Sequence, residues 1–120
     1  MANKICHFEV IGKDKAALET FYSSIFEWKL QPVMDEYSLV FPGVKPDGGI
    51  GTSPNVDHYA TFYVEVADVA AHLEKIESLG GKKLMGPMQV PNGPIIGMFN
   101  DPAGNMIGLV QEGSGPQMQG

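Results

Sequence analysis

The chain repeats one short motif after an interval of 54 residues. Residues 7–10 read His-Phe-Glu-Val and residues 61–64 read Thr-Phe-Tyr-Val, and each run has the alternating pattern of a strand. Each is followed at the same distance by an aspartate, Asp14 or Asp68, that can cap a helix. A fixed period of this kind decides the architecture before any single motif does. The sequence therefore predicts two copies of one folding module.

Both copies have the same predicted order, which is a strand, a helix and three further strands. The first helix carries an apolar stripe that should be buried against a sheet, made of Ala17, Leu18, Phe21, Tyr22, Ile25 and Phe26. The second helix carries Val69, Leu73, Ile76 and Leu79, and we expect it to end at Gly80 or Gly81. Strands are predicted at residues 4–11, 28–33, 37–41, 48–52, 59–66, 82–90, 95–99 and 106–111.

These elements predict an α+β fold in which two tandem βαβββ modules form a curved mixed sheet around a cleft. Residues 1–112 are expected to be one domain, with modules at about 4–53 and about 59–112. Residues 113–120 contain no core-forming side chain and are expected to be a disordered tail.

Composition excludes several classes of function. The net charge of −6 argues against a nucleic-acid binder, which needs clustered lysine and arginine. The single cysteine, Cys6, cannot form an internal disulfide. No signal peptide and no apolar run of about 18 residues is evident, so we expect no membrane contact and a cytoplasmic location.

The period of two along a strand predicts which side chains share a face. In the first strand, Cys6, Phe8 and Val10 should face the helix, whereas Ile5, His7 and Glu9 should face the other way. In the fifth strand, Phe62, Val64 and Val66 should face the helix, and Thr61, Tyr63 and Glu65 the other way. The faces away from the helices thus mix polar and aromatic groups, which is typical of a concave pocket.

Several segments together resemble a known superfamily. They are residues 7–10, Phe21-Tyr22, residues 26–28, Gly48-Gly49-Ile50-Gly51, Leu79-Gly80-Gly81 and the turn Asp101-Pro102-Ala103-Gly104-Asn105. In this order they resemble the vicinal oxygen chelate superfamily, which contains glyoxalase I, bleomycin-resistance proteins and extradiol dioxygenases. The resemblance runs from residue 4 to residue 112, and the turn before Ile107 is similar to the branch related to lactoylglutathione lyase. Fold alone does not imply function.

The resemblance implies four metal-ligand positions in the metal-dependent members. Each half contributes two of them, one on its first strand and one on its last strand. His7 matches the first position. The others fall on Thr61, on Gly108 and near Ile50 or Gly51, none of which is a typical ligand. We therefore expect no cofactor. A divalent ion held by His7, Glu9 and Glu65 is the less favoured alternative. Where the family often has glycine, Glu27 must take a left-handed conformation or let the helix end differently.

The main hypothesis is a metal-free protein that binds a small organic molecule, with Gly49, Gly51 and Gly108 leaving room at the floor of the cleft. The expected pocket contains Ile5, Trp28, Phe41, Thr61, Tyr63, Glu65, Met98, Met106, Gly108 and Val110. A second hypothesis is a glyoxalase-type lyase or isomerase acting on a small carbonyl compound, with His7 and Glu9 as its acid–base pair. A third is a resistance-type protein that sequesters a cationic drug. Relatives of this size commonly dimerise, so we expect a homodimer.

Overall fold

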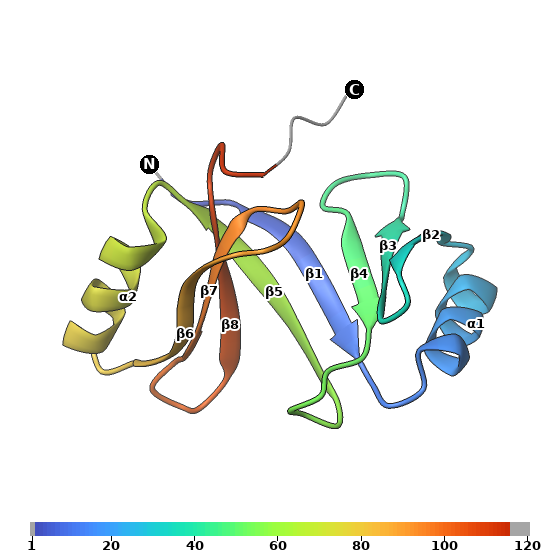
Figure 1. Cartoon of the computed structure of the whole chain (residues 1–120), viewed down its shortest axis with the longest axis horizontal. Coiled ribbons are helices and arrows are strands. Elements are labelled where there is room, and N and C mark those ends of the chain that lie inside the picture. The colour runs from blue at the N-terminus through green and yellow to red at the C-terminus, as the bar shows by residue number, and fades with distance from the viewer. Residues whose placement is uncertain (1, 116–120) are drawn as a thin grey trace. The chain divides into compact units, whose positions relative to one another are not determined.

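The computed structural model describes residues 2–115, and its elements follow the predicted order (Figure 1). The first copy of the motif comprises β1 (Ile5–Ile11), α1 (Lys15–Phe26), β2 (Lys29–Met34), β3 (Tyr37–Phe41) and β4 (Gly48–Gly51). The second comprises β5 (Tyr59–Val66), α2 (Val69–Ser78), β6 (Lys82–Gln89), β7 (Ile95–Asn100) and β8 (Met106–Gln111). The α+β class and the repeated βαβββ order are confirmed.

The chain divides into two compact units. The N-terminal unit is Cys6–Phe62, and the C-terminal unit combines Met1–Ile5 with Tyr63–Gly120. Within the N-terminal unit the strand order is β2-β3-β4-β1, with β1 and β4 parallel and the other pairs antiparallel. Within the C-terminal unit the order is β5-β8-β7-β6, and only β5 and β8 are parallel. Each unit thus has the same topology, as the sequence repeat predicts.

The boundary between the units falls inside two strands, between Ile5 and Cys6 in β1 and between Phe62 and Tyr63 in β5. Ile5 opens β1 but belongs to the C-terminal unit, where the Asn3 side chain donates a hydrogen bond of 3.0 Å to the Glu65 carbonyl. Lys4 adds an ion pair of 3.7 Å with the Glu65 carboxylate. The tail predicted over residues 113–120 lies mostly outside the described residues. In its described part, the Ser114 hydroxyl accepts a hydrogen bond from the Ile95 amide at 2.9 Å.

Aspartates begin both helices. The Asp14 carboxylate accepts from the Ala17 amide at 3.0 Å, and Asp68 accepts from the Ala71 amide at 3.1 Å. The C-terminal ends differ. Glu27 takes the left-handed conformation with φ 57°, while α2 is followed by Gly80 at φ 98°.

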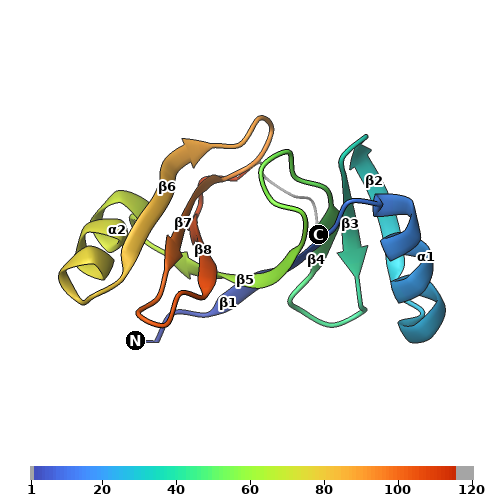
Figure 2. The same cartoon turned by 90° about the horizontal axis from the view of Figure 1, so that it is seen from below.

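The C-terminal unit has a well-sealed core. In Figure 2, α2 runs along β6 and β7. Four buried residues form this core, and four partly buried residues pack against it: Val66, Val69, Leu73 and Leu109, with Val64, Ile76, Ile95 and Phe99. Val64 and Val66 therefore face the helix as predicted, while Phe62 remains 38% exposed.

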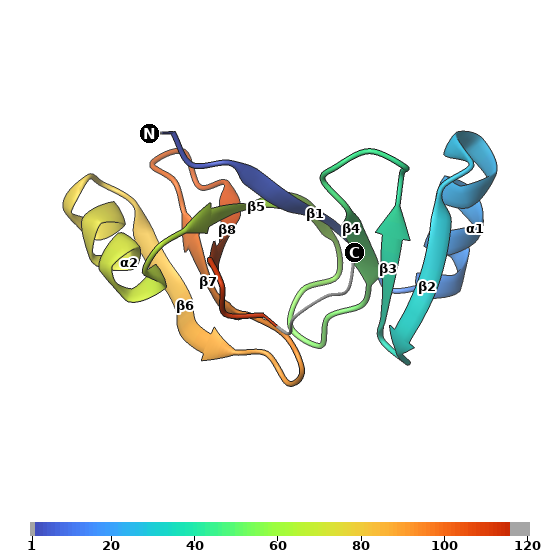
Figure 3. The same ribbon diagram turned by 90° about the horizontal axis from the view of Figure 1, so that it is seen from above.

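The predicted burial of α1 is wrong. No residue of α1 is buried, and Phe21 and Phe26 are more than half exposed. Contacts of α1 with its sheet are few and fall on β4 and on the edge strand β2, beside which α1 lies in Figure 3. β2 is itself mostly exposed. In the part of the chain that the structure describes, neither helix is long and apolar enough to cross a membrane.

Candidate functional site

Four polar side chains of the N-terminal unit form one hydrogen-bonded group, which we call the Glu9 cluster: His7, Glu9, Tyr37 and Tyr59. The Glu9 carboxylate is its centre. Tyr37 Oη donates to Glu9 Oε2 at 3.0 Å, and Tyr59 Oη donates to Glu9 Oε1 at 2.7 Å. His7 Nε2 lies 2.8 Å from Tyr37 Oη. Glu9 is only 8% exposed, so these donors compensate a carboxylate that is largely removed from water.

Strand register brings the cluster together. His7 and Glu9 share a face of β1 because they are two residues apart. Glu9 pairs with Gly49 in β4, and Tyr37 in β3 pairs with Gly51. The ring of Tyr37 extends over both glycines: a Cβ atom added at Gly49 would lie 1.7 Å from Tyr37 Oη. At Gly51 an added Cβ would lie 2.6 Å from Tyr37 Cδ1. The space above these glycines, which the sequence suggested was open, is filled by a tyrosine.

The hydrogen bonds favour one tautomer of His7. A carboxylate only accepts, so Tyr37 gives its single hydroxyl proton to Glu9. The tautomer of His7 that continues this path has its proton on Nε2, donated to Tyr37 Oη, and its lone pair on Nδ1. Burial lowers the pKa of His7 from its ordinary value, although the charges of Glu9 and Asp47 oppose this effect. Burial and the adjacent Glu9 charge raise the pKa of Tyr59 well above its usual range.

The lowered pKa of His7 predicts a loss of stability in mild acid. The unfolded chain binds a proton near pH 6.5, whereas the folded state binds it only at lower pH. As pH falls through 6.5, protons bind the unfolded state first, so the free energy of unfolding decreases until pH lies below the folded pKa. Chemical denaturation between about pH 5 and pH 8 measures this slope. His7→Gln should remove the part of the slope due to His7, and a slope identical to that of the wild type would contradict the assignment.

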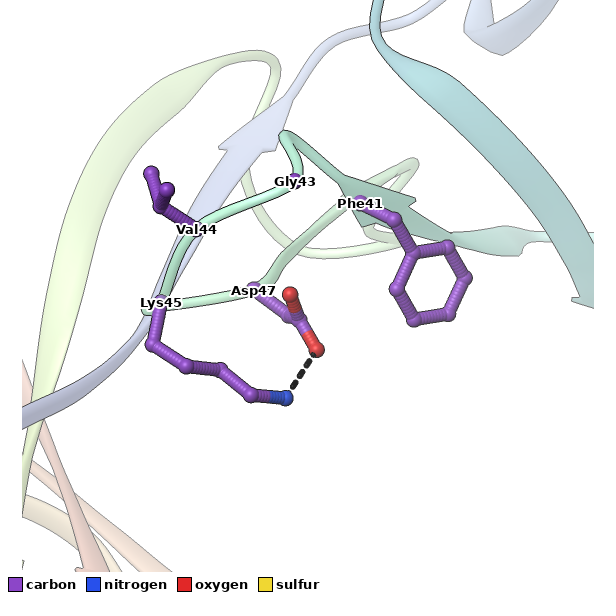
Figure 4. A pocket seen from close by; sticks show the side chains of 5 residues that line it. All are labelled: Phe41, Gly43, Val44, Lys45 and Asp47. Atoms are coloured by element: carbon purple, nitrogen blue, oxygen red, sulfur yellow. Dashed lines mark hydrogen bonds and ion pairs between the residues drawn. The ribbon is translucent and has the colours of Figure 1, made fainter. Parts of the chain in front are cut away.

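An open depression lies at the end of β3 and in the loop that leads to β4 (Figure 4). Its volume is about 390 Å³, and it is lined by Phe41, Gly43, Val44, Lys45 and Asp47. Lys45 Nζ bonds to Asp47 Oδ2 at 2.7 Å. The Asp47 carbonyl accepts from the Phe8 amide, and its carboxylate is close enough to His7 to raise the pKa of that imidazole. One residue that lines the depression, Asp47, thus acts electrostatically on His7 of the Glu9 cluster.

Comparison with known proteins identifies the family. The family model of the glyoxalase, bleomycin resistance protein and dioxygenase superfamily matches residues 4–109. The chain belongs to this superfamily. A glyoxylase-like domain-containing protein from Didymella fabae is 29% identical over an alignment 113 residues long, which covers 85% of this chain and 88% of that protein.

Several solved structures share the fold at low sequence identity. A hypothetical protein from Bacillus halodurans has a TM-score of 0.72 at 11% identity, with both chains covered completely. Methylmalonyl-CoA epimerase from Mycobacterium tuberculosis has a TM-score of 0.66 at 15% identity, covering 89% of this chain and 86% of the epimerase. The Mn(II)-bound glyoxalase from Novosphingobium aromaticivorans has a TM-score of 0.67 at 14% identity, covering 98% of this chain and 44% of the glyoxalase.

The metal that the superfamily implies does not fit the residues of this chain. Within residues 2–115, no group of three His, Cys, Asp or Glu side chains is arranged to hold an ion. Of the two β4 residues expected at this position, Gly51 shares the face of Glu9, as does Gly49, whereas Ile50 pairs with Val10 and is fully buried. The Tyr37 hydroxyl group is already hydrogen-bonded to one possible metal-ligand atom of His7 and to one of Glu9. An ion at this position would have to displace the Tyr37 hydroxyl group from both of them.

The structure divides the predicted pocket residues of this glyoxalase-like chain between the units. Phe41 lines the depression, and Thr61 lies two residues after Tyr59 in β5. Trp28 belongs elsewhere: it packs on Phe8, Tyr22 and Phe26, with ring centroids 5.1–5.8 Å apart. Because Phe8 alternates with His7 and Glu9 along β1, Trp28 lies on the helix side of the sheet and not with the Glu9 cluster.

The remaining predicted pocket residues lie in the C-terminal unit. Tyr63 and Met98 are both 7% exposed, and the ring of Tyr63 covers Gly108, where an added Cβ would lie 2.3 Å from Tyr63 Cδ2. Glu65 pairs with Val110 in the sheet, Met106 begins β8, and Ile5 is 51% exposed. The expected room above Gly108 is thus also filled by a tyrosine.

Sequence reasoning missed Tyr37, Tyr59 and Asp47. The signal for Tyr37 was present: a tyrosine opens the strand that precedes a Gly-Gly-Ile-Gly run, and glycine within a strand often marks a close approach by another group. Nothing local points to Tyr59, which reaches Glu9 from 50 residues away.

Proposed function

We propose that this chain is a metal-free, glyoxalase-like protein that binds a small organic molecule. The depression lined by Phe41, Val44 and Asp47 carries this proposal, and the charge of Asp47 links it to His7 of the Glu9 cluster. A mostly apolar hollow with a few polar groups is the usual form of a small-molecule site. Its volume of about 390 Å³ suits a ligand smaller than a typical drug. The polar groups are already positioned by one another, so binding does not require them to rearrange.

Ligand binding should raise the melting temperature without added metal. A ligand at 100 times its dissociation constant stabilises the folded state by about 2.7 kcal/mol, or several degrees. The panel to screen contains 2-oxoaldehydes and hydrophobic cations, each with and without EDTA. For any hit, Phe41→Ala should weaken binding about 10-fold or more, because it removes the apolar wall of the depression. Phe21→Ala on exposed α1 is the matched control and should leave binding unchanged. Stabilisation that disappears with EDTA would refute the proposal.

An acid–base activity is the second candidate. The observation in its favour is the continuous hydrogen-bonded path from His7 through Tyr37 to Glu9, with His7 neutral near pH 7. A neutral imidazole can accept a proton from the carbon next to a carbonyl group, which is the first step of a glyoxalase-type isomerisation. Deuterium exchange at that carbon, followed by NMR in D₂O, would detect the step. His7→Ala should abolish it, and exchange that persists in His7→Ala would exclude this role.

Sequestration of a cationic drug is the third candidate, and the carboxylates of Glu9 and Asp47 favour it. Both lie near His7 and attract positive charge. Asp47→Asn should selectively weaken the cations of the panel while sparing neutral 2-oxoaldehydes. Equal weakening of both ligand types would exclude a charge-selective role.

A homodimer is proposed from the size of the chain. A small unit buries a modest core, and pairing adds buried area. Light scattering should give twice the chain mass of 12.9 kDa. A single species at the monomer mass, at the concentration used for binding, would contradict it.

A further inference from the structure

We propose that the hydroxyl group of Tyr37 takes the place of a metal ion in the N-terminal unit. The polar groups that would ligate an ion are joined instead through one phenol oxygen and its proton. The proposal concerns how His7 and Glu9 are held in the absence of an ion, and it does not depend on which ligand the protein binds.

The first argument is the position of the hydroxyl group. Tyr37 Oη lies 2.8 Å from His7 Nε2 and 3.0 Å from Glu9 Oε2. An imidazole nitrogen and a carboxylate oxygen are the atoms that a divalent ion would bind on these residues. Both are hydrogen-bonded to the same oxygen atom.

The second argument is space. A ligating side chain at Gly49 would begin with a Cβ atom 1.7 Å from Tyr37 Oη, so a ligand at position 49 and tyrosine at position 37 exclude each other. Gly49 is the β4 residue that pairs with Glu9, so a side chain at position 49 would lie on the same face of the sheet as the Glu9 carboxylate. The glycine and the tyrosine form a matched pair.

A tyrosine also lies against a glycine in the C-terminal unit, although it comes from β5, the first strand of that module, whereas Tyr37 comes from β3. Tyr63 of β5 pairs with Gly108 of β8, and an added Cβ at Gly108 would lie 2.3 Å from the Tyr63 ring. In each unit a tyrosine ring therefore covers a glycine of the strand that runs parallel to the first. In both units, therefore, the space over the glycine is filled by a ring of the same unit.

Cobalt binding tests the exchange of phenol for ion. Purified wild-type protein is compared with three variants: Tyr37→Ala, Gly49→Glu, and the double variant Tyr37→Ala/Gly49→Glu. Each protein is titrated with Co²⁺, whose visible absorption reports coordination by protein ligands. The double variant offers His7, Glu9 and a new carboxylate, a three-ligand set that leaves a position for water. We expect it to bind Co²⁺ at least about 100-fold more tightly than the wild type, since added ligands raise affinity steeply.

Two controls make the result specific. Adding His7→Ala to the double variant should abolish the gain, and Gly49→Glu alone should not bind, because Tyr37 still blocks the position. Stoichiometric Co²⁺ binding by wild-type protein would overturn the proposal. So would a double variant that has the wild-type circular dichroism spectrum but no gain in affinity.

Imidazole NMR of the wild type gives a test that does not depend on the variants folding. The proposal requires the proton of neutral His7 on Nε2, which nitrogen shifts of labelled histidine distinguish from the other tautomer. Tyr37→Phe should perturb the Nε2 resonance, whereas Tyr59→Phe, which keeps Tyr37, should leave the tautomer unchanged. A proton on Nδ1 of His7 in the wild type would overturn the proposal.

Discussion

Replacing Gly49 with alanine should lower the free energy of unfolding by about 3 kcal/mol or more, an unusually large effect for one methyl group. The added Cβ would lie 1.7 Å from Tyr37 Oη and 2.1 Å from Tyr37 Cζ. The tyrosine cannot move aside cheaply because its hydroxyl group is bonded to both His7 and Glu9. Steric strain and lost hydrogen bonds therefore add together. Urea denaturation followed by fluorescence gives the measurement.

A double-mutant cycle identifies Tyr37 as the source of the strain. Tyr37→Ala alone should also destabilise, by about 3 kcal/mol, because it empties the space over the glycines. In Tyr37→Ala/Gly49→Ala the steric conflict is gone, so the two losses should not add. Gly115→Ala is the matched control, since its Cβ would meet Pro94 at an ordinary contact distance of 3.6 Å. Additive losses within about 0.5 kcal/mol would show that the strain lies elsewhere.

The repeat made the fold predictable because it fixes element order and strand pairing together. Helix starts were also predictable, since Asp14 and Asp68 act on amides three residues away. The burial of α1 was not. An apolar stripe shows which face of a helix seeks a sheet, but the area of sheet available to cover it depends on how much of the edge strand β2 is itself covered. A local pattern carries no information about that.

The candidate site was only half predictable for a similar reason. Alternation along β1 placed His7 and Glu9 on one face. Their partners Tyr37 and Tyr59 come from other strands, and the register of those strands depends on the folded sheet. Glycine was the misleading residue: Gly49, Gly51 and Gly108 suggested empty space, but in the structure tyrosine rings lie against each of them. A missing side chain shows that something approaches closely, and only the fold shows whether it is a ligand or the chain itself.

Removing the Glu9 carboxylate should weaken both the fold and the site. Glu9→Ala takes away the acceptor of two tyrosine hydroxyl groups and leaves a gap in a residue position that is only 8% exposed. The substitution also removes the desolvation penalty of a buried charge, which offsets part of the lost stability. Tyr37 and Tyr59 are both only partly buried, so water can replace part of the acceptor that each loses. We expect a net loss of about 2–3 kcal/mol for Glu9→Ala, and about 1 kcal/mol for Glu9→Gln, whose amide oxygen still accepts one bond.

The titration of His7 distinguishes the effect of the Glu9 charge from the effect of the shape of its side chain. The charge of Glu9 raises the pKa of His7 against the larger lowering by burial. Glu9→Gln keeps the side-chain shape but removes the charge, so the midpoint of the His7 titration should move to lower pH, as proton NMR of the imidazole would show. Glu36→Gln, at an exposed position before β3, is the control and should leave the midpoint in place. A His7 midpoint that stays constant or rises in Glu9→Gln would mean that the carboxylate does not act on the imidazole, and the Glu9 cluster would then be a packing contact without a role in proton chemistry.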